Sequence, residues 1–257
     1  LSAGVAHFSD LDFGVPGAAI VKKGDPRASV LYLRLTTLGS LHMPPLASQV
    51  VDEDGAKLIH VDPRFTRTSA GADIYARLRP GTDAAFQNAM INHIIVNKLY
   101  DEDYVVTHTN ALYLSDEAFD FKDGLFSGYD ETTHSYDTKT WGYQLDAKGY
   151  ARIAKSLDDP HCVFARLKTF VSRYTLEKGE QITGIPADQI KLIAEMMVKN
   201  RPGSILYALG MTQHTTGVQG IRSFTILQLL LGNIGKPGGG VNALRGEPNV
   251  QGACDMA

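Results

Sequence analysis

The stretch Ser204-Ile-Leu-Tyr-Ala-Leu-Gly-Met-Thr-Gln-His-Thr-Thr-Gly-Val-Gln-Gly-Ile-Arg-Ser-Phe-Thr-Ile-Leu-Gln-Leu-Leu-Leu-Gly232 decides the fold class. It predicts an apolar strand at 204–209, a polar loop with a glycine at each end at 210–217, and an apolar helix at 218–231 that Gly232 ends. This order is the crossover unit of α/β proteins, in which loop amides at the positive end of a helix can receive phosphate oxygens. Neither G-x-G-x-x-G nor G-x-x-x-x-G-K-[ST] occurs, so no standard nucleotide fingerprint applies.

The flanking sequence repeats the alternation of strands and helices. An apolar run at 56–61 ends before Asp62-Pro63, and a second strand at 74–79 is stopped by Pro80-Gly81. We therefore predict an α/β fold with a mostly parallel sheet, flanking helices and right-handed crossovers. Three further helices are expected at about 83–97, 162–175 and 186–199, and an aromatic-rich segment at about 101–160 is expected to be an irregular insertion.

Composition sets broad limits on function. The chain has 257 residues, 44% of them hydrophobic, and a formal net charge of −3, which argues against nucleic acid as the main partner. Two cysteines are too few for a disulfide framework, and the eight histidines lack metal-site spacing. The longest apolar run, 224–231, is far too short to span a membrane, but we expect it to be exposed and to promote self-association. The start at Leu1 suggests a fragment.

Four residues outside the C-terminal run are candidates for ligand contact, each with a plain structural alternative. Asp62 follows a strand and can hold a ribose hydroxyl or a guanine edge, or can simply form a turn before proline. Arg64 can balance phosphate charge or remain solvated, and Asp83 can bind a ligand or cap its helix. His214 lies in the polar loop and is the histidine with the best claim to ligand contact.

The glycine-rich run at 238–256 carries Arg245 among amide and carboxylate side chains. Glycines permit close approach of backbone to a ligand, and a guanidinium offers a planar fork of donors to a carboxylate. The run is too polar for a core element, so it is either a plain connector or backbone shaped around an anionic ligand.

Five motifs occur together in one order: His60-Val-Asp-Pro-Arg-Phe-Thr-Arg-Thr-Ser69, Leu78-Arg-Pro-Gly-Thr-Asp83, Leu206-Tyr-Ala-Leu-Gly-Met-Thr-Gln-His214, Leu229-Leu-Leu-Gly-Asn-Ile-Gly235 and the run from Gly238 to Met256. This combination resembles the catalytic (alpha or major) subunit of molybdenum- or tungsten-dependent formate dehydrogenases, which bind two molybdopterin guanine dinucleotides. The aromatic insertion resembles the respiratory, periplasmic branch, that of formate dehydrogenase-N. The likeness covers residues 55–257, which would form part of one domain of a larger multidomain subunit.

The resemblance implies a role for each matching position. The guanosine end of one dinucleotide would meet Asp62, Arg64, Gly81 and Asp83, while the pterin or its diphosphate would meet Gly210, Met211 and Gln213. Arg245 would orient formate beside the metal, and Glu247, Asn249 and Gln251 would shape the same pocket. No metal ligand is expected within the chain, because the family's cysteine or selenocysteine ligand and its 4Fe-4S cysteine motif have no counterpart here.

The implied partners are formate, an iron–sulfur electron-transfer subunit and a membrane cytochrome b subunit, with a periplasmic location favoured and a cytoplasmic one still open. The isolated chain is expected to be inactive. A nitrate reductase-like enzyme of the same cofactor group and a non-catalytic nucleotide-binding or assembly module stay open as alternatives. Residues 1–54 depart from the family pattern and faintly resemble a c-type cytochrome segment, although no C-x-x-C-H haem motif occurs.

Overall fold

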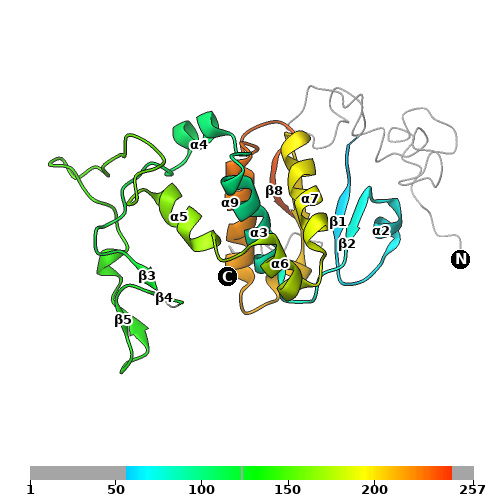
Figure 1. Ribbon diagram of the computed structural model, residues 1–257, viewed down its shortest axis with the longest axis horizontal. Helices are drawn as coiled ribbons and strands as arrows, with labels where there is room; N and C mark the ends of the chain where they lie inside the picture. The colour runs from blue at the N-terminus through cyan, green and yellow to red at the C-terminus, as the bar shows by residue number, and fades with distance from the viewer. Residues whose placement is uncertain (1–55, 123, 245–257) are drawn as a thin grey trace, which may run out of the picture.

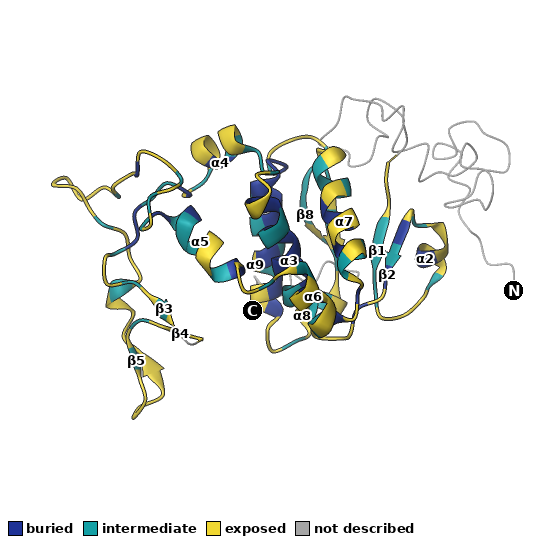
Figure 2. Cartoon of the chain, in the orientation of Figure 1, coloured by how far each residue is buried: buried dark blue, intermediate teal, exposed yellow. Residues whose placement is uncertain are grey.

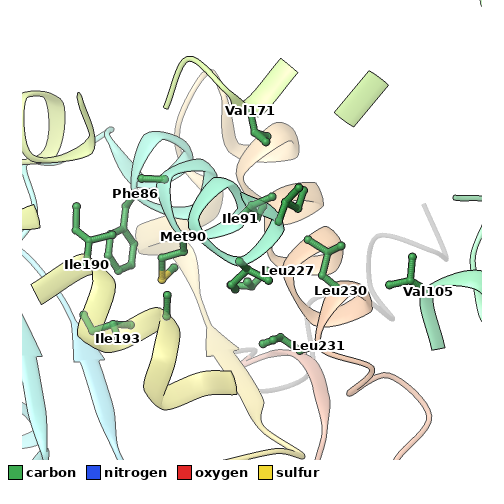
Figure 3. Close-up of a cluster of buried hydrophobic side chains, with 14 of the residues drawn as sticks. Phe86, Met90, Ile91, Val105, Val171, Ile190, Ile193, Leu227, Leu230 and Leu231 are labelled. Atoms are coloured by element: carbon green, nitrogen blue, oxygen red, sulfur yellow. The ribbon is translucent and has the colours of Figure 1, made fainter. Parts of the chain in front are cut away.

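The computed structural model describes residues 56–122 and 124–244, and a single buried helix, α3 (Asp83–Val96), lies at its centre. Eight residues of α3 are buried, among them Phe86, Met90 and Ile91. Side chains from neighbouring helices close around them (Figure 3). The helices packed on α3 are α5 (Val163–Val171), α6 (Leu176–Thr183), α7 (Ala187–Lys199) and α9 (Gly217–Leu230). The expected helices at 83–97, 162–175, 186–199 and 218–231 are thus confirmed to within a few residues.

Two pairs of parallel strands accompany these helices. β1 (Ile59–Val61) pairs with β2 (Ile74–Ala76), and the short helix α2 (Arg67–Gly71) lies in the connection between the two strands. In the second pair, β7 (Ser204–Tyr207) pairs with β8 (Gly240–Ala243). In Figure 1, β1 and β2 are seen beyond α7, and β8 is seen between α9 and α7. The mixture of helices with parallel strands is as predicted. A single mostly parallel sheet is not formed by the described residues, because the two pairs are short and remain separate two-stranded sheets.

Most of the segment 101–160, which we expected to be an insertion, extends away from the helical body (Figure 1). It begins with a helix that the sequence reading missed, α4 (Glu102–His108), whose first turn is capped by Asp101 through a bond from Tyr104 N. The remainder is irregular, as expected, and largely exposed (Figure 2). Its regular pieces are two antiparallel hairpins and one 3-10 turn: β3 (Phe121–Lys122) with β4 (Leu125–Phe126), β5 (Tyr129–Asp130) with β6 (Ser135–Tyr136), and η2 (Thr138–Thr140).

One expectation about the C-terminal part is wrong. The apolar run 224–231 is not exposed: Leu227, Leu230 and Leu231 are buried, because α9 packs against α3 on one side and β8 on another. The glycine-rich run starts in a turn at 238–239, and residues 240–243 then form β8 beside β7 without any of them being buried. No helix within the described ranges is both long and apolar enough to cross a bilayer.

Candidate functional site

Two loops from distant parts of the chain meet beyond the ends of β2 and β7. The first carries Gly81 at a φ of +81°, a conformation that favours glycine. The second contains His214, whose Nδ1 lies 3.9 Å from the position that a Cβ on Gly81 would occupy. The His214 ring is held from its other side, because Nε2 lies 2.9 Å from the Gly210 carbonyl oxygen. Three predicted site residues are therefore brought together.

Asp83 lies in the first turn of α3 beside the same histidine. Burial raises the pKa of its carboxyl above the ordinary value, while its own backbone amide and the charge of His214 act in the opposite direction. Asp83 does not serve as the helix cap. Thr82 is the N-cap residue, and its hydroxyl turns back to donate to the Arg79 carbonyl at 2.6 Å. The carboxylate of Asp83 is thus held half-buried without a capping role, contrary to the simpler interpretation.

The predicted loop 210–217 contains a short helix, α8 (Leu209–Thr212), that lies against the first turns of α9. Two glycines permit this contact. A Cβ on Gly217 would lie 2.5 Å from the Thr212 carbonyl oxygen, and one on Gly220 would lie 3.0 Å from the Met211 methyl group. Met211 is therefore half-buried against α9, whereas Gly210 and Gln213 are exposed. The paired glycines at 217 and 220 are a signal that sequence reasoning could have used, because residues three apart share a helix face.

The N-termini of α3 and α9 differ in charge. α3 has Asp83 in its first turn, but α9 has no acidic residue there and its N-cap residue Thr216 makes no side-chain cap hydrogen bond. Among the described residues, the amides of Val218 and Gln219 have no hydrogen-bond acceptor. Free amides and a helix dipole without a nearby carboxylate can accept an anion at α9, whereas Asp83 disfavours one at α3.

Asp62 and Arg64 lie after β1 and form a tight turn, because Asp62 Oδ1 accepts a hydrogen bond from Arg64 N at 2.6 Å. The Asp62 backbone oxygen also accepts one from the Tyr75 hydroxyl at 2.9 Å. The turn interpretation of Asp62 is therefore correct, and it leaves Oδ2 without a partner in the described part of the chain. No hydrogen bond or ion pair between described residues joins this turn to the loops at Gly81 or His214.

Arg245, Glu247, Asn249 and Gln251 lie outside the described residues. The chain approaches them from β8, whose register places Ala243 opposite Tyr207, and Leu244 N still donates to the Tyr207 carbonyl at 2.7 Å. A buried side chain that sequence reasoning missed supports this strand pair. Gln228 Nε2 donates to the carbonyls of Gly203 and Gly240, each at 2.8 Å, and so ties together the starts of β7 and β8.

Two cavities of about 270 and 280 Å³ lie elsewhere, around α4, α5 and the end of α3. Neither is lined by a predicted site residue, and the candidate site is the place where the Gly81 and His214 loops meet. Within residues 56–122 and 124–244, no group of three or more His, Cys, Asp or Glu side chains is placed to hold a metal ion. Cys162, a free thiol, is buried at the N-cap of α5, where its sulfur accepts a hydrogen bond from Ala165 N.

The two loops follow parallel strands and lead into the N-termini of helices. This arrangement is typical of the class of α/β proteins that bind nucleotides or other anions beyond the carboxyl ends of their strands. Within this class the chain belongs to the molybdopterin oxidoreductase family, whose model matches residues 42–257.

Similar proteins include the formate dehydrogenase 2 subunit alpha (cytochrome c-553) of Nitratidesulfovibrio vulgaris, 48% identical over 80% of this chain and 21% of that protein. The formate dehydrogenase subunit alpha of Megalodesulfovibrio gigas is 50% identical over 79% of this chain and 20% of its own length. The formate dehydrogenase-O major subunit of Escherichia coli is 47% identical over the same shares. The chain thus spans about a fifth of the length of these relatives. Among solved structures, acetylene hydratase from Pelobacter acetylenicus matches with a TM-score of 0.48 and 27% identity, over 72% of this chain and 18% of that one.

Proposed function

We propose that this chain is part of the catalytic subunit of a formate dehydrogenase, which oxidises formate to carbon dioxide with release of one proton and two electrons. Membership of the molybdopterin oxidoreductase family and identities of 47–50% to subunits of that name support the proposal. The main structural support is the contact between the Gly81 and His214 loops. This contact brings together two of the family motifs that are more than 130 positions apart in the sequence.

The described residues fit a guanine dinucleotide of molybdopterin, of which a full subunit would hold two. The acid-free N-terminus of α9 suits the diphosphate, so Gly210, Met211, Gln213 and His214 would line the diphosphate or the pterin. When bound, this group would supply the redox centre, with molybdenum or tungsten as its metal.

The guanosine end carries hydroxyl and N–H donors instead of extra negative charge, which suits the carboxylates at the neighbouring edge. Asp83 would accept from it, as would Asp62 Oδ2, which has no partner among residues 56–122 and 124–244, with Gly81 allowing close approach and Arg64 balancing charge.

Formate itself would be held by Arg245, which in the sequence is two positions after the last residue of β8. A guanidinium can form a short charge-assisted pair with a one-carbon carboxylate and orient its C–H bond without taking up the proton. We assign Glu247, Asn249 and Gln251 to the same pocket. Relatives named as subunits support the presence of partner subunits. From the family resemblance we further propose for the full subunit a 4Fe-4S cluster, an iron–sulfur partner subunit, a membrane cytochrome b partner and a periplasmic location.

Binding of guanosine diphosphate (GDP) tests the cofactor assignment. We expect the chain to bind GDP in calorimetry, with ADP weaker by about tenfold or more, because a site built for the adjacent N–H donors of guanine leaves its acceptors unpaired with adenine. Asp83→Asn should weaken GDP binding. Asp188→Asn, which removes an acid from the first turn of α7, serves as the matched control. Equal affinity for the two nucleotides, or an equal effect of the two variants, would contradict the assignment.

Activity assays separate the remaining alternatives. We expect the isolated 257-residue chain to show no formate-dependent dye reduction, since it lacks a counterpart of the family's metal ligand. The parent enzyme should reduce dye with formate and should not reduce nitrate, and formate activity should be lost in Arg245→Met. GDP binding by the chain together with a parent protein free of metal and pterin would favour the non-catalytic module.

A further inference from the structure

The loop that carries Gly81 and Asp83 is anchored to the end of a helix that is distant in sequence. The Arg79 guanidinium donates through Nη1 to the carbonyls of Gln181, at 2.7 Å, and Ile182, at 3.0 Å. Both residues belong to the last turn of α6, where carbonyl groups have no partner within the helix. A cation at this end of a helix also complements the helix dipole. Arg79 thus acts as a side-chain cap for the C-terminus of α6.

The backbone of Arg79 continues the same connection. Its N–H donates to the Thr183 carbonyl at 2.8 Å, and its own carbonyl accepts from both the hydroxyl and the amide of Thr82, at 2.6 and 3.3 Å. Thr82 is the N-cap residue of α3. Arg79 therefore links the end of α6 to the start of α3, with Pro80 and Gly81 held between the two points.

Close packing completes the anchor. α6 ends at Gly184, which has a φ of +79°, and a Cβ there would lie 3.5 Å from Arg79 Cζ. The guanidinium is therefore packed against the C-terminal turn of α6. The Arg79 guanidinium is directed to backbone carbonyls of α6. The His214 ring instead faces Gly81, which follows Arg79 by two positions.

We propose that Arg79 is a positioning residue for the guanosine end of the dinucleotide: it makes no contact with the ligand, but holds Gly81 and Asp83 opposite the His214 loop. The proposal rests on the proposed function for the identity of the ligand. It assigns Arg79 a role different from that of Arg64 and Arg245, which are expected to meet charged groups of cofactor or substrate directly.

The test compares Arg79→Met and Arg79→Lys with Arg77→Met. Arg77 is an exposed arginine two positions away that forms no hydrogen bond or ion pair among the described residues. In the ligand-free chain, hydrogen exchange at the amides of Thr82 and Phe86 should accelerate about tenfold in Arg79→Met, because both amides report the anchored turn. Arg77→Met should exchange as the wild type. Unchanged exchange in α4 would show that all variants remain folded.

GDP affinity is the second readout. Arg79→Met should bind GDP about tenfold more weakly, since a supporting contact sets the geometry of a site, and Arg79→Lys should recover part of the loss by donating to one carbonyl. Loss of GDP affinity with unchanged exchange would make Arg79 a direct ligand contact and overturn the proposal, as would unchanged exchange and affinity together. If the wild type does not bind GDP, the proposed cofactor assignment fails, and the exchange data still decide whether Arg79 positions the loop.

Discussion

At the scale of single residues, Asp83 is a carboxyl group whose partial burial lowers the stability of the folded state at neutral pH. A carboxyl whose pKa is raised by burial is more stable protonated, so its ionisation at neutral pH opposes folding. The Asp83 carboxyl is not needed as the cap of α3, because Thr82 occupies the N-cap position and its hydroxyl donates a hydrogen bond to the Arg79 carbonyl. An acid that the fold tolerates without using is a candidate for ligand binding, because selection for function can maintain such a residue against its structural cost.

The sign of this effect leads to a prediction. The pKa of Asp83 in the folded chain lies above the ordinary 3.8. The raised pKa therefore stabilises the folded state fully below pH 3.8, and this stabilisation is lost as the pH rises through the pKa of the folded state. Asp83→Asn should therefore unfold at a higher temperature than the wild type at neutral pH, and the difference should shrink in acid. Thermal unfolding followed by circular dichroism across this range provides the measurement.

Asp73 offers a control of opposite sign. Its pKa is lowered, chiefly by the hydrogen bond that its carboxylate accepts from Leu58 N, with Lys57 contributing as well. Asp73→Asn should therefore lower the unfolding temperature at neutral pH, with the difference again shrinking as pH falls. Parallel behaviour of the two variants would refute the assignment of Asp83 as a carboxyl that burial disfavours.

At the scale of elements, the contact between α8 and α9 decides the shape of the His214 loop. Gly217 N donates to the His214 carbonyl at 2.9 Å, so the loop closes directly onto the first residue of α9. This closure depends on the missing side chain at position 217, where a Cβ would overlap the Thr212 carbonyl. The two glycines that bound the loop are therefore not equivalent, since Gly210 has no atom within 4 Å of its Cβ position.

Substituting each glycine by alanine tests this difference. Gly217→Ala should lower the free energy of unfolding by about 1–3 kcal/mol, because backbone must shift to admit the methyl group. Gly210→Ala should leave it unchanged or raise it by up to about 1 kcal/mol, since alanine favours a helical turn and restricts the unfolded chain. Urea unfolding of the two variants gives both values, and equal effects would show that α8 does not press on α9.

At the scale of the whole molecule, exposed apolar side chains lie at several places, and one such place is the outer face of the β7–β8 pair. Ile205 and Tyr207 turn inward, with the Tyr207 ring 5.9 Å from that of Phe224 on α9. Leu206 is 60% exposed, and Leu244, two positions after its partner Asn242, is 59% exposed. Because side chains alternate along a strand, Leu206 and Leu244 share the outer face. Self-association is thus expected here and not along α9.

Sedimentation velocity over a dilution series tests this expectation. The wild-type chain should form larger species as its concentration rises. In the double variant Leu206→Ser, Leu244→Ser, this association should begin only at a higher protein concentration. Leu192→Ser removes a leucine from α7 that is 51% exposed and should have little effect, so it controls for a general gain in solubility. A wild-type chain that stays monomeric throughout would contradict the prediction.

The sequence by itself determined the elements whose causes are local. The apolar run before Gly232 predicted α9, and Pro63 marked the end of β1, whereas β2 ends at Ala76, before the predicted end at 79. Helix periodicity predicted α3 and α7, and the ordered motifs predicted the family. Each element was predicted from residues close together in the chain, and the family from five short motifs in one order, so neither prediction needs knowledge of packing.

Only the tertiary structure decided which of the candidate residues meet. Gly81 faces His214, and Arg79 caps α6 more than 100 positions away, without any pattern in the sequence that pairs them. The same is true of β8, which follows three glycines with Gly240 as its first residue and is formed by pairing with β7 and by the bond from Gln228, and not by its own propensity. Such contacts arise because α3 is buried on nearly every side, and the order in which helices surround it sets which loops lie at one edge.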